Sequence, residues 1–187
     1  MLKHLETLVI SGCSNLNGLQ KNMEYMESLI VLKADGIALT HSLPTNGQVN
    51  AVQSFIWPWQ LKPRENSKIS WLSLPQSLVK LSLSKCNLSD DEFPRDLSNL
   101  YSLEELDLSS NQFCSLPAFI RGLTKLESLY ILSCPRLRKL DGVPQLGHIY
   151  FGGNRLLEEL TFQISHQPTT TCHGDTCNIH NATIKRF

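Results

Sequence analysis

The feature that most limits how this 187-residue chain can fold is a short, repeated pattern of apolar residues. An apolar residue, in most cases leucine, recurs at offsets zero, three and five of each copy, and Cys, Asn or Ile follows at offset eight. Repeats of about 20 to 50 residues are typical of folds built by stacking. The six copies are Leu5, Leu8, Ile10 and Cys13; Leu29, Leu32, Ala34 and Ile37; Leu78, Leu81, Leu83 and Cys86; Leu103, Leu106, Leu108 and Asn111; Leu126, Leu129, Ile131 and Cys134; and Leu146, Ile149, Phe151 and Asn154.

This spacing is that of the leucine-rich repeat, L-x-x-L-x-L-x-x-N/C-x-L. Successive side chains of a strand point to opposite faces, so the residues at offsets three and five face the core and the residue at offset four faces outward. No turn buries its apolar face alone, so neighbouring turns must stack. We therefore predict an α/β repeat fold, a leucine-rich-repeat solenoid with a curved parallel sheet on its concave face and short helices or loops on its convex face.

One interval between copies is about twice as long as the others. The copies start near residues 5, 29, 78, 103, 126 and 146, so the 49-residue step from the second to the third is the exception. Within 44–70, Val52, Phe55 and Trp57 fit a degenerate repeat, but Pro58 lacks the backbone donor that an interior strand needs. The segment is therefore either a degenerate repeat or a surface insertion.

The leucine period covers residues 1–161, which we predict to form the repeat array. The first repeat follows Met1 almost at once, which leaves its strand as an edge and suggests a fragment or a truncated product. From 162 to 187 the chain is polar and rich in turn formers. We expect this tail to be disordered.

Cysteine and asparagine side chains fill offset eight, where the chain leaves the strand. A buried side chain there satisfies backbone groups that the turn leaves without partners, which asparagine does well and cysteine also does. Strands two turns apart are separated by about 10 Å, so cysteines at that separation are too far apart for a disulfide or a shared metal. We predict structural turn roles for Cys13, Cys86, Asn111, Cys134 and Asn154.

Motifs for metal binding and catalysis are weak or missing. Cys172, His173, Cys177 and His180 are residue types that bind zinc, but their spacing is not a strong finger pattern. The sequence contains no G-x-S-x-G, H-E-x-x-H, G-x-x-x-x-G-K-[ST] or G-x-G-x-x-G motif. We therefore predict a chain that is not an enzyme and that has no catalytic residues, metal or cofactor.

Seventeen basic residues balance seventeen acidic ones, so any partner must be recognised locally. We expect no nucleic-acid partner, and no window is apolar enough to predict a membrane partner. The outward residues at offsets four and six form a candidate protein-binding face, because exposed tyrosines are typical of interface hot spots. An ordinary exposed sheet is the alternative. The candidate residues are Lys33, Ser82, Asp107, Tyr130, Leu132 and Tyr150.

Longer stretches resemble one family in particular. "LETLVISGCSNLNGL", "ADGIAL" and "SKCNLSDDEFPRDL" are similar to the repeat region of plant disease-resistance proteins, the intracellular TIR-type NB-LRR immune receptors. The resemblance covers about residues 2 to 161, and the G-x-I-P motif of secreted plant repeats is absent. It does not include a signalling domain or a phosphate loop, so it implies no nucleotide binding and no NAD cleavage by this chain.

The resemblance implies an effector-sensing and autoinhibitory module that acts in plant defence. The expected partner is a protein, either a pathogen effector or the nucleotide-binding module of a longer parent receptor. The expected location is the cytoplasm, or the cytoplasm and the nucleus. The alternative is a stand-alone intracellular leucine-rich-repeat scaffold or adaptor with no immune role.

Overall fold

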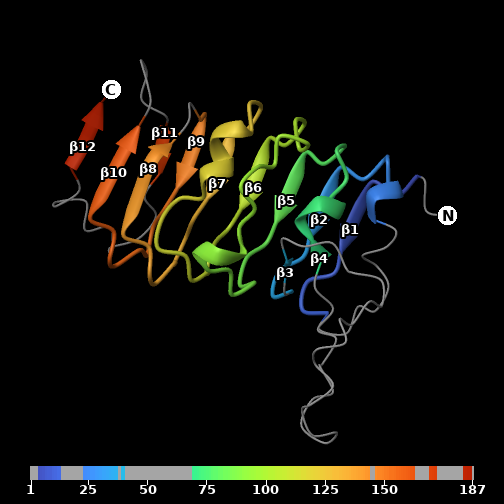
Figure 1. Ribbon diagram of the computed structural model, residues 1–187, viewed down its shortest axis with the longest axis horizontal. Coiled ribbons are helices and arrows are strands. Elements are labelled where there is room, and N and C mark those ends of the chain that lie inside the picture. Colours follow the sequence, from blue (N-terminus) through green and yellow to red (C-terminus); the bar gives the residue numbers. More distant parts are fainter. Residues whose placement is uncertain are drawn as a thin grey trace, which may run out of the picture.

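The computed structural model describes residues 4–13, 23–37, 39–40, 69–143, 146–162, 169–171 and 183–186. Its main feature is a seven-stranded parallel sheet whose strands follow one another in chain order (Figure 1). The strands are β1 (Thr7–Val9), β2 (Val31–Lys33), β5 (Lys80–Ser82), β6 (Glu105–Asp107), β7 (Ser128–Tyr130), β9 (His148–Tyr150) and β11 (Thr169–Thr171).

The register of this sheet places the repeated leucines in one inward-facing column. Each member is the Cα partner of the next one across the sheet, and all except Leu8 are buried. The column consists of Leu8, Leu32, Leu81, Leu106, Leu129 and Ile149. Burying a leucine side chain stabilises the fold by roughly 1.5–3 kcal/mol, so stacking the turns supplies the main driving force. The predicted leucine-rich-repeat solenoid is confirmed.

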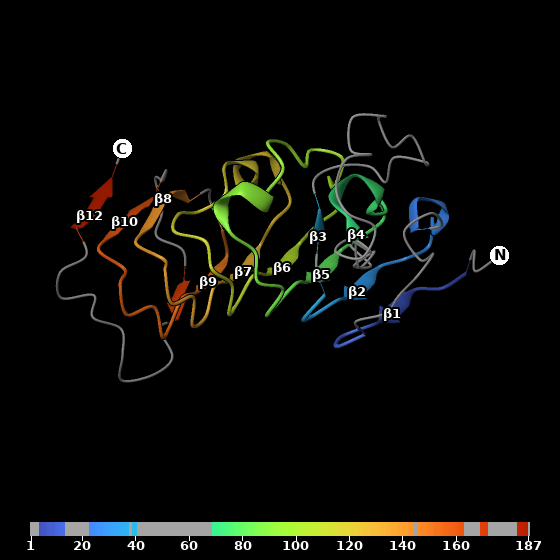
Figure 2. The same ribbon diagram turned by 60° about the horizontal axis from the view of Figure 1, so that its bottom comes forward.

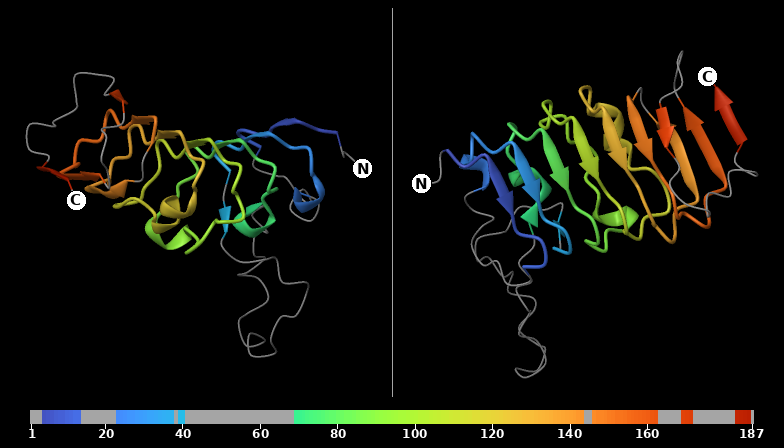
Figure 3. Two further views of the ribbon diagram at one scale, coloured as in Figure 1. Left: turned by 90° about the horizontal axis from the view of Figure 1, so that it is seen from above. Right: turned by 180° about the vertical axis from the view of Figure 1, so that it is seen from behind.

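Short 3-10 helices and two smaller sheets complete the turns. The helices η2 (Met23–Tyr25), η4 (Trp71–Ser73), η5 (Asp90–Glu92) and η6 (Ala118–Gly122) are three to five residues long. Figure 3 shows short helices on the side of the coil away from the seven-stranded sheet. Figure 2 shows the three-stranded parallel sheet at the C-terminal end, made of β8 (Lys139–Val143), β10 (Glu159–Phe162) and β12 (Thr183–Arg186).

The long interval in the sequence does not interrupt the seven-stranded sheet. β2 pairs directly with β5, with Val31 opposite Lys80 and Lys33 opposite Ser82. The described sheet therefore has no strand between β2 and β5, and the segment predicted to be either a degenerate repeat or a surface insertion, 44–70, lies mostly outside the described residues. A separate two-stranded sheet joins β3 (Leu39–Thr40) to β4 (Ile69–Ser70), and residues 41–68 lie outside the described part of the chain.

Strand structure continues beyond the leucine period. β11 pairs in parallel with β9, and β12 pairs in parallel with β10. The expectation of a disordered tail is therefore wrong for these two segments. Thr170 is opposite Ile149, at the position that earlier turns give to leucine. Threonine is β-branched and favours extended backbone, but a leucine pattern does not detect it.

An aromatic cluster extends the core on the side opposite the main sheet. The Trp71 ring centroid is 5.7 Å from that of Phe119 and 6.0 Å from that of Phe93, and Phe113 packs edge-on against Phe93 at 5.4 Å. The Trp71 side chain is fully buried, and its indole nitrogen donates to the Glu92 carbonyl at 3.0 Å. Burial with a satisfied N–H makes this tryptophan an anchor for the chain that follows the long interval.

Candidate functional site

Each turn leaves the sheet through a residue in the left-handed backbone region, always at offset seven. In the first five repeats the N–H of this residue donates to the offset-six carbonyl of the next repeat, as Ser110 does to Leu132 at 2.7 Å. The sheet ladder therefore extends into the turn and directs the following side chain inward. The φ angles at offset seven are 75° at Gly12, 74° at Gly36, 57° at Lys85, 58° at Ser110, 54° at Ser133 and 79° at Gly153, and Asn87, two residues after Lys85, also has a positive φ of 55°.

Buried asparagines at offset eight join neighbouring turns. The Asn111 Nδ2 donates to the carbonyls of Leu83 and Leu108, both at 2.9 Å, and its Oδ1 accepts the Leu88 N–H at 3.0 Å. Because Leu83 and Leu88 belong to the preceding repeat, one side chain satisfies backbone groups of two turns. Asn154 makes equivalent bonds to Ile131, Phe151 and Cys134.

Cys86 and Cys134 occupy the same turn position with fewer bonds. The Cys86 thiol donates to the Ala34 carbonyl at 3.2 Å, and the Cys134 thiol donates to the Leu108 carbonyl at 3.6 Å. Burial raises the pKa of each thiol to about 11. Both thiols are therefore protonated at neutral pH, which makes them weak nucleophiles and weak metal ligands.

Cys13 lies at the same offset but is exposed. In the last four repeats the side chain at offset eight bonds to a carbonyl of the preceding repeat, such as Ala34 for Cys86. Cys13 belongs to the first repeat of the described residues, where β1 is the terminal strand of the sheet and no earlier described turn supplies that carbonyl. The prediction of a buried turn role is therefore wrong for Cys13.

The candidate binding face forms one row across the sheet, which we call the outward row. The outward row consists of Val9, Lys33, Ser82, Asp107, Tyr130 and Tyr150, and each residue is the Cα partner of the next. Val9 and Lys33 are exposed, and the other four residues are half-buried. The structure therefore brings five of the six candidate residues together on neighbouring strands.

The residues at offset six lie in the turns beside the outward row. Leu132, the sixth candidate, is half-buried, and its N–H donates to the Ser109 hydroxyl at 3.0 Å. Asp35 accepts hydrogen bonds from the Ser11 hydroxyl at 3.0 Å and the Ser82 hydroxyl at 2.5 Å. Asp35 is at offset six, so the repeat pattern places it beside the outward row, but its contacts with Ser11 and Ser82 join neighbouring turns and do not follow from the pattern.

Two tyrosines of the outward row form a stacked pair. The ring centroids of Tyr130 and Tyr150 are 4.4 Å apart and the ring planes differ by 3°. Stacked aromatic rings stabilise each other by about 0.5–1.5 kcal/mol beyond their burial. Burial raises the pKa of the Tyr130 phenol, and the nearby Glu105 carboxylate raises it further. The Tyr130 phenol is therefore uncharged at physiological pH.

A hollow of about 330 Å³ adjoins the tyrosine pair, lined by residues of β2, β5, β6 and β7. In it the Lys80 Nζ lies 2.8 Å from a Glu105 carboxylate oxygen, and this contact raises the pKa of Lys80. Lys80 and Glu105 occupy offset two of their repeats, on the same sheet face as the outward row. Neither residue was among the predicted candidates, which lie at offsets four and six, although strand alternation also places offset two on this face.

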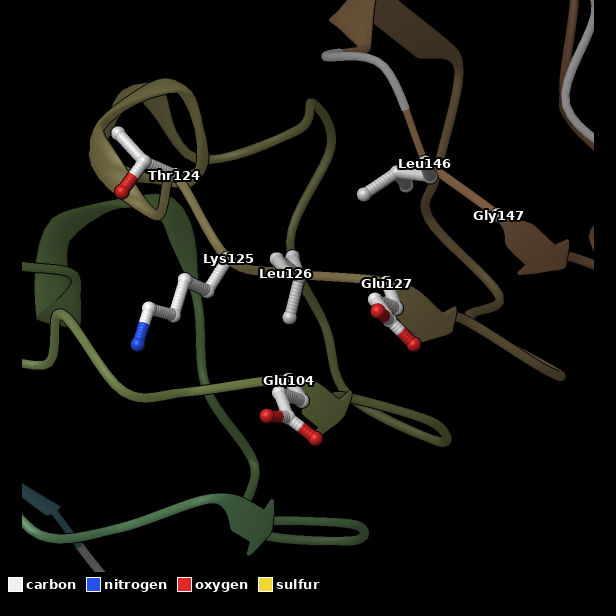
Figure 4. A pocket seen from close by; sticks show the side chains of 7 residues that line it. All are labelled: Glu104, Thr124, Lys125, Leu126, Glu127, Leu146 and Gly147. Atoms are coloured by element: carbon white, nitrogen blue, oxygen red, sulfur yellow. The ribbon is translucent and has the colours of Figure 1, made fainter.

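A second hollow, of about 690 Å³, lies where β6, β7 and β9 begin (Figure 4). Its lining includes Glu104, Lys125 and Glu127, all of which are exposed. Figure 4 shows the two carboxylates extending in a similar direction and the Lys125 amine pointing elsewhere. Across the described residues, no group of three or more His, Cys, Asp or Glu side chains could hold a metal ion. The second hollow is therefore an open, charged surface.

Outside the outward row, Arg136 and Arg138 are exposed, and the neighbouring Lys139 pairs with Glu159 at 3.1 Å on the three-stranded sheet. The four Cys and His residues of the weak zinc pattern, within 172–180, lie outside the described residues. Within the described ranges, no helix has the length and apolar character needed to cross a membrane.

Comparison with known proteins agrees with this architecture. The Leucine Rich Repeat family model matches residues 77–100 and 102–123. TMV resistance protein N of Nicotiana glutinosa is 31% identical over 146 residues, and disease resistance-like protein DSC1 of Arabidopsis thaliana is 30% identical over 149 residues. These alignments cover 76% and 77% of this chain. Receptor-like protein 49 of Arabidopsis thaliana is 32% identical over 124 residues, which is 65% of this chain.

The chain spans a small part of each relative, 12% of the first two and 14% of the third. The aligned part nevertheless covers most of the repeats described above. Stacked repeats of this kind present extended surfaces that mediate protein–protein interactions. The resemblance to the repeat region of a plant TIR-type NB-LRR protein is confirmed, and the chain belongs to the leucine-rich-repeat family as a repeat module of a plant disease-resistance receptor.

Proposed function

We propose that the outward row is the surface with which this module binds a protein. The proposed partner is a pathogen effector or, in a longer parent receptor, that receptor's own nucleotide-binding module. The proposed location is the cytoplasm. Resistance to TMV in the name of the Nicotiana glutinosa relative supports a role in pathogen sensing.

The stacked pair of Tyr130 and Tyr150 is the observation that carries this proposal. Tyrosine supplies a large contact area at low entropic cost and is enriched among the residues that dominate binding energy. Here the two rings are held against each other at 4.4 Å, so little ring freedom is left to lose on binding. Both residues are half-buried on the sheet face and leave part of each ring accessible.

The surroundings of the tyrosine pair also suit a protein partner. Lys33 is exposed on one side of the pair, and Asp107 lies directly next to Tyr130 in the register. Charged groups around an aromatic centre orient a partner and increase the association rate. The outward row crosses six neighbouring strands from β1 to β9, which at about 4.8 Å per strand gives roughly 24 Å of contact length. This length suits a protein segment better than a small molecule.

Photocrosslinking tests which face binds the partner. The full chain carries p-benzoylphenylalanine in place of Lys33 in one variant and in place of Arg121, exposed on η6, in the control. In extracts of infected plant tissue, we expect adducts from position 33 and none from position 121. The double variant Tyr130→Ala/Tyr150→Ala should reduce the yield of the position-33 adduct about tenfold or more. Its unfolding midpoint should show that the variant is still folded under the conditions of the experiment. Adducts from position 121 alone would contradict the proposal, as would adducts that do not depend on the tyrosines.

A further inference from the structure

The hollow beside the tyrosine pair has the size of a side-chain subsite. Its volume of about 330 Å³ is at the small end of the range for ligand clefts. The side chains of Lys33, Lys80, Glu105, Asp107 and Tyr130 border it. It therefore offers room for one side chain of a partner and surrounds that side chain with charged groups and an aromatic ring.

The charges around this hollow are unequally compensated. Glu105 is paired with Lys80 at 2.8 Å. Asp107, on the same strand, uses one oxygen to accept the Ser109 N–H at 2.8 Å, and no cationic side chain among the described residues forms a salt bridge with it. Lys33 lies two strands away on β2, a separation of about 10 Å that is comparable with the Debye length. Asp107 is therefore the one carboxylate lining this hollow that has no salt-bridge partner among the described residues.

Tyr130 supplies an aromatic wall next to this carboxylate. Tyr150 covers one face of the Tyr130 ring, and the strand that carries Tyr150 lies on the side away from β6. Tyr130 also lines the hollow with residues of β2, β5 and β6. The uncovered side of its ring therefore borders the hollow, with Asp107 as its register partner.

We infer that this hollow is a subsite for an arginine side chain of the bound protein, whose guanidinium pairs with Asp107 and lies against the uncovered face of Tyr130. The inference rests on the proposed function and specifies the chemistry of the partner. A guanidinium is planar, accepts stacking on an aromatic ring and donates two parallel hydrogen bonds to a carboxylate. A lysine ammonium is a compact charge that cannot make the bidentate contact, so the geometry favours arginine over lysine.

Titration with capped tripeptides tests the inference on the full chain. The probes are Ac-Gly-Arg-Gly-NH2, its lysine analogue and its neutral citrulline analogue, followed by NMR signals of the Tyr130 ring and the Asp107 amide. We expect saturable shifts with arginine at a dissociation constant on the order of millimolar, and binding about tenfold weaker with lysine or citrulline. If the citrulline peptide bound as tightly as the arginine peptide, pairing of charges would not explain binding. If the lysine peptide bound as tightly, recognition of a planar group would not explain it. Either result overturns the inference.

Matched variants separate the subsite from general charge effects. Asp107→Asn and Tyr130→Leu should each weaken the arginine peptide about tenfold, whereas Asp91→Asn, on the exposed η5, should leave it unchanged. The unfolding midpoint of each variant shows that it is folded. Loss of arginine binding in Asp91→Asn would contradict the inference.

If the arginine peptide fails to bind while position-33 adducts still depend on the tyrosines, the inference is wrong and the proposed function stands. If the variant with p-benzoylphenylalanine at position 33 forms no adducts, the proposed function is wrong. In that case the arginine that occupies the subsite does not come from a protein bound to the outward row.

Discussion

The first turn and the interior turns of this array share one sequence pattern but not one environment. Cys13 and Asn111 occupy the same offset, yet Cys13 is exposed and Asn111 is fully buried. Asn111 bonds to two residues of the preceding repeat, and Cys13 has no such repeat before it among the described residues. The difference teaches that a repeat residue acquires its role from the neighbour on its N-terminal side, so stability resides between turns.

The comparison is tested most strongly by removing the side chain at offset eight in both places. Asn111→Ala should lower the free energy of unfolding by about 4 kcal/mol, because it leaves several buried backbone groups of two turns without partners. Cys13→Ala should change it by less than about 0.5 kcal/mol. Urea unfolding followed by circular dichroism measures both values. Similar losses in the two variants would show that the role does not depend on the neighbouring turn.

Alkaline pH should test the burial of the thiols in the interior turns. Burial raises the pKa of Cys86 from 9.0 to about 11, so the folded chain holds this proton more tightly than the unfolded chain. The stabilisation is fully present below about pH 9 and is lost as the pH rises through about 11, a loss of about 2 kcal/mol for this thiol. Unfolding free energies at pH 8 and pH 11 measure the loss. Cys86→Asn should reduce the loss by that amount, and an undiminished loss in this variant would contradict the assignment to Cys86.

Glycines at offset seven offer a smaller contrast between the same regions. Gly153 and Gly12 both have positive φ, of 79° and 75°. A Cβ on Gly153 would lie 2.8 Å from the Ser133 hydroxyl, whereas a Cβ on Gly12 would meet nothing within 4 Å. Gly153→Ala should lower the free energy of unfolding by about 2 kcal/mol, and Gly12→Ala should lower it by about 1 kcal/mol. The second value arises from backbone strain alone. Thermal unfolding of both variants measures the difference, and a larger cost at Gly12 would contradict the comparison.

The smallest effect is expected when one interior turn residue replaces another. Cys86→Asn should change the free energy of unfolding by less than about 1 kcal/mol, because asparagine fills this position in two other repeats. In the native wild-type chain, mass spectrometry after brief alkylation should find Cys13 modified and Cys86 protected. Rapid alkylation of Cys86 would show that its turn is open and that burial does not separate the two regions.

The leucine pattern predicts much of this structure because it is local. It assigns Leu81 to the core and Tyr130 to the surface from strand alternation alone, and both assignments agree with the observed burial. The alignment of Tyr130 with Tyr150 also follows from counting offsets within each repeat. These predictions succeed because each depends only on residues a few positions apart in the chain.

Features that depend on two turns at once were not predicted. The Asp35 contacts and the Lys80–Glu105 pair require knowing which strands are neighbours, and the long interval left the neighbour of β2 undecided. The exposure of Cys13 depends on what precedes it in space. β11 was missed for another reason, because threonine satisfies the backbone preference of a strand without the leucine that marks the other turns.

The direct pairing of β2 with β5 has a consequence for how such a module can vary. The chain between these strands can gain or lose residues during evolution without changing the order of side chains on the sheet face. Point substitutions in the outward row and length changes between β2 and β5 are thus independent routes to diversity.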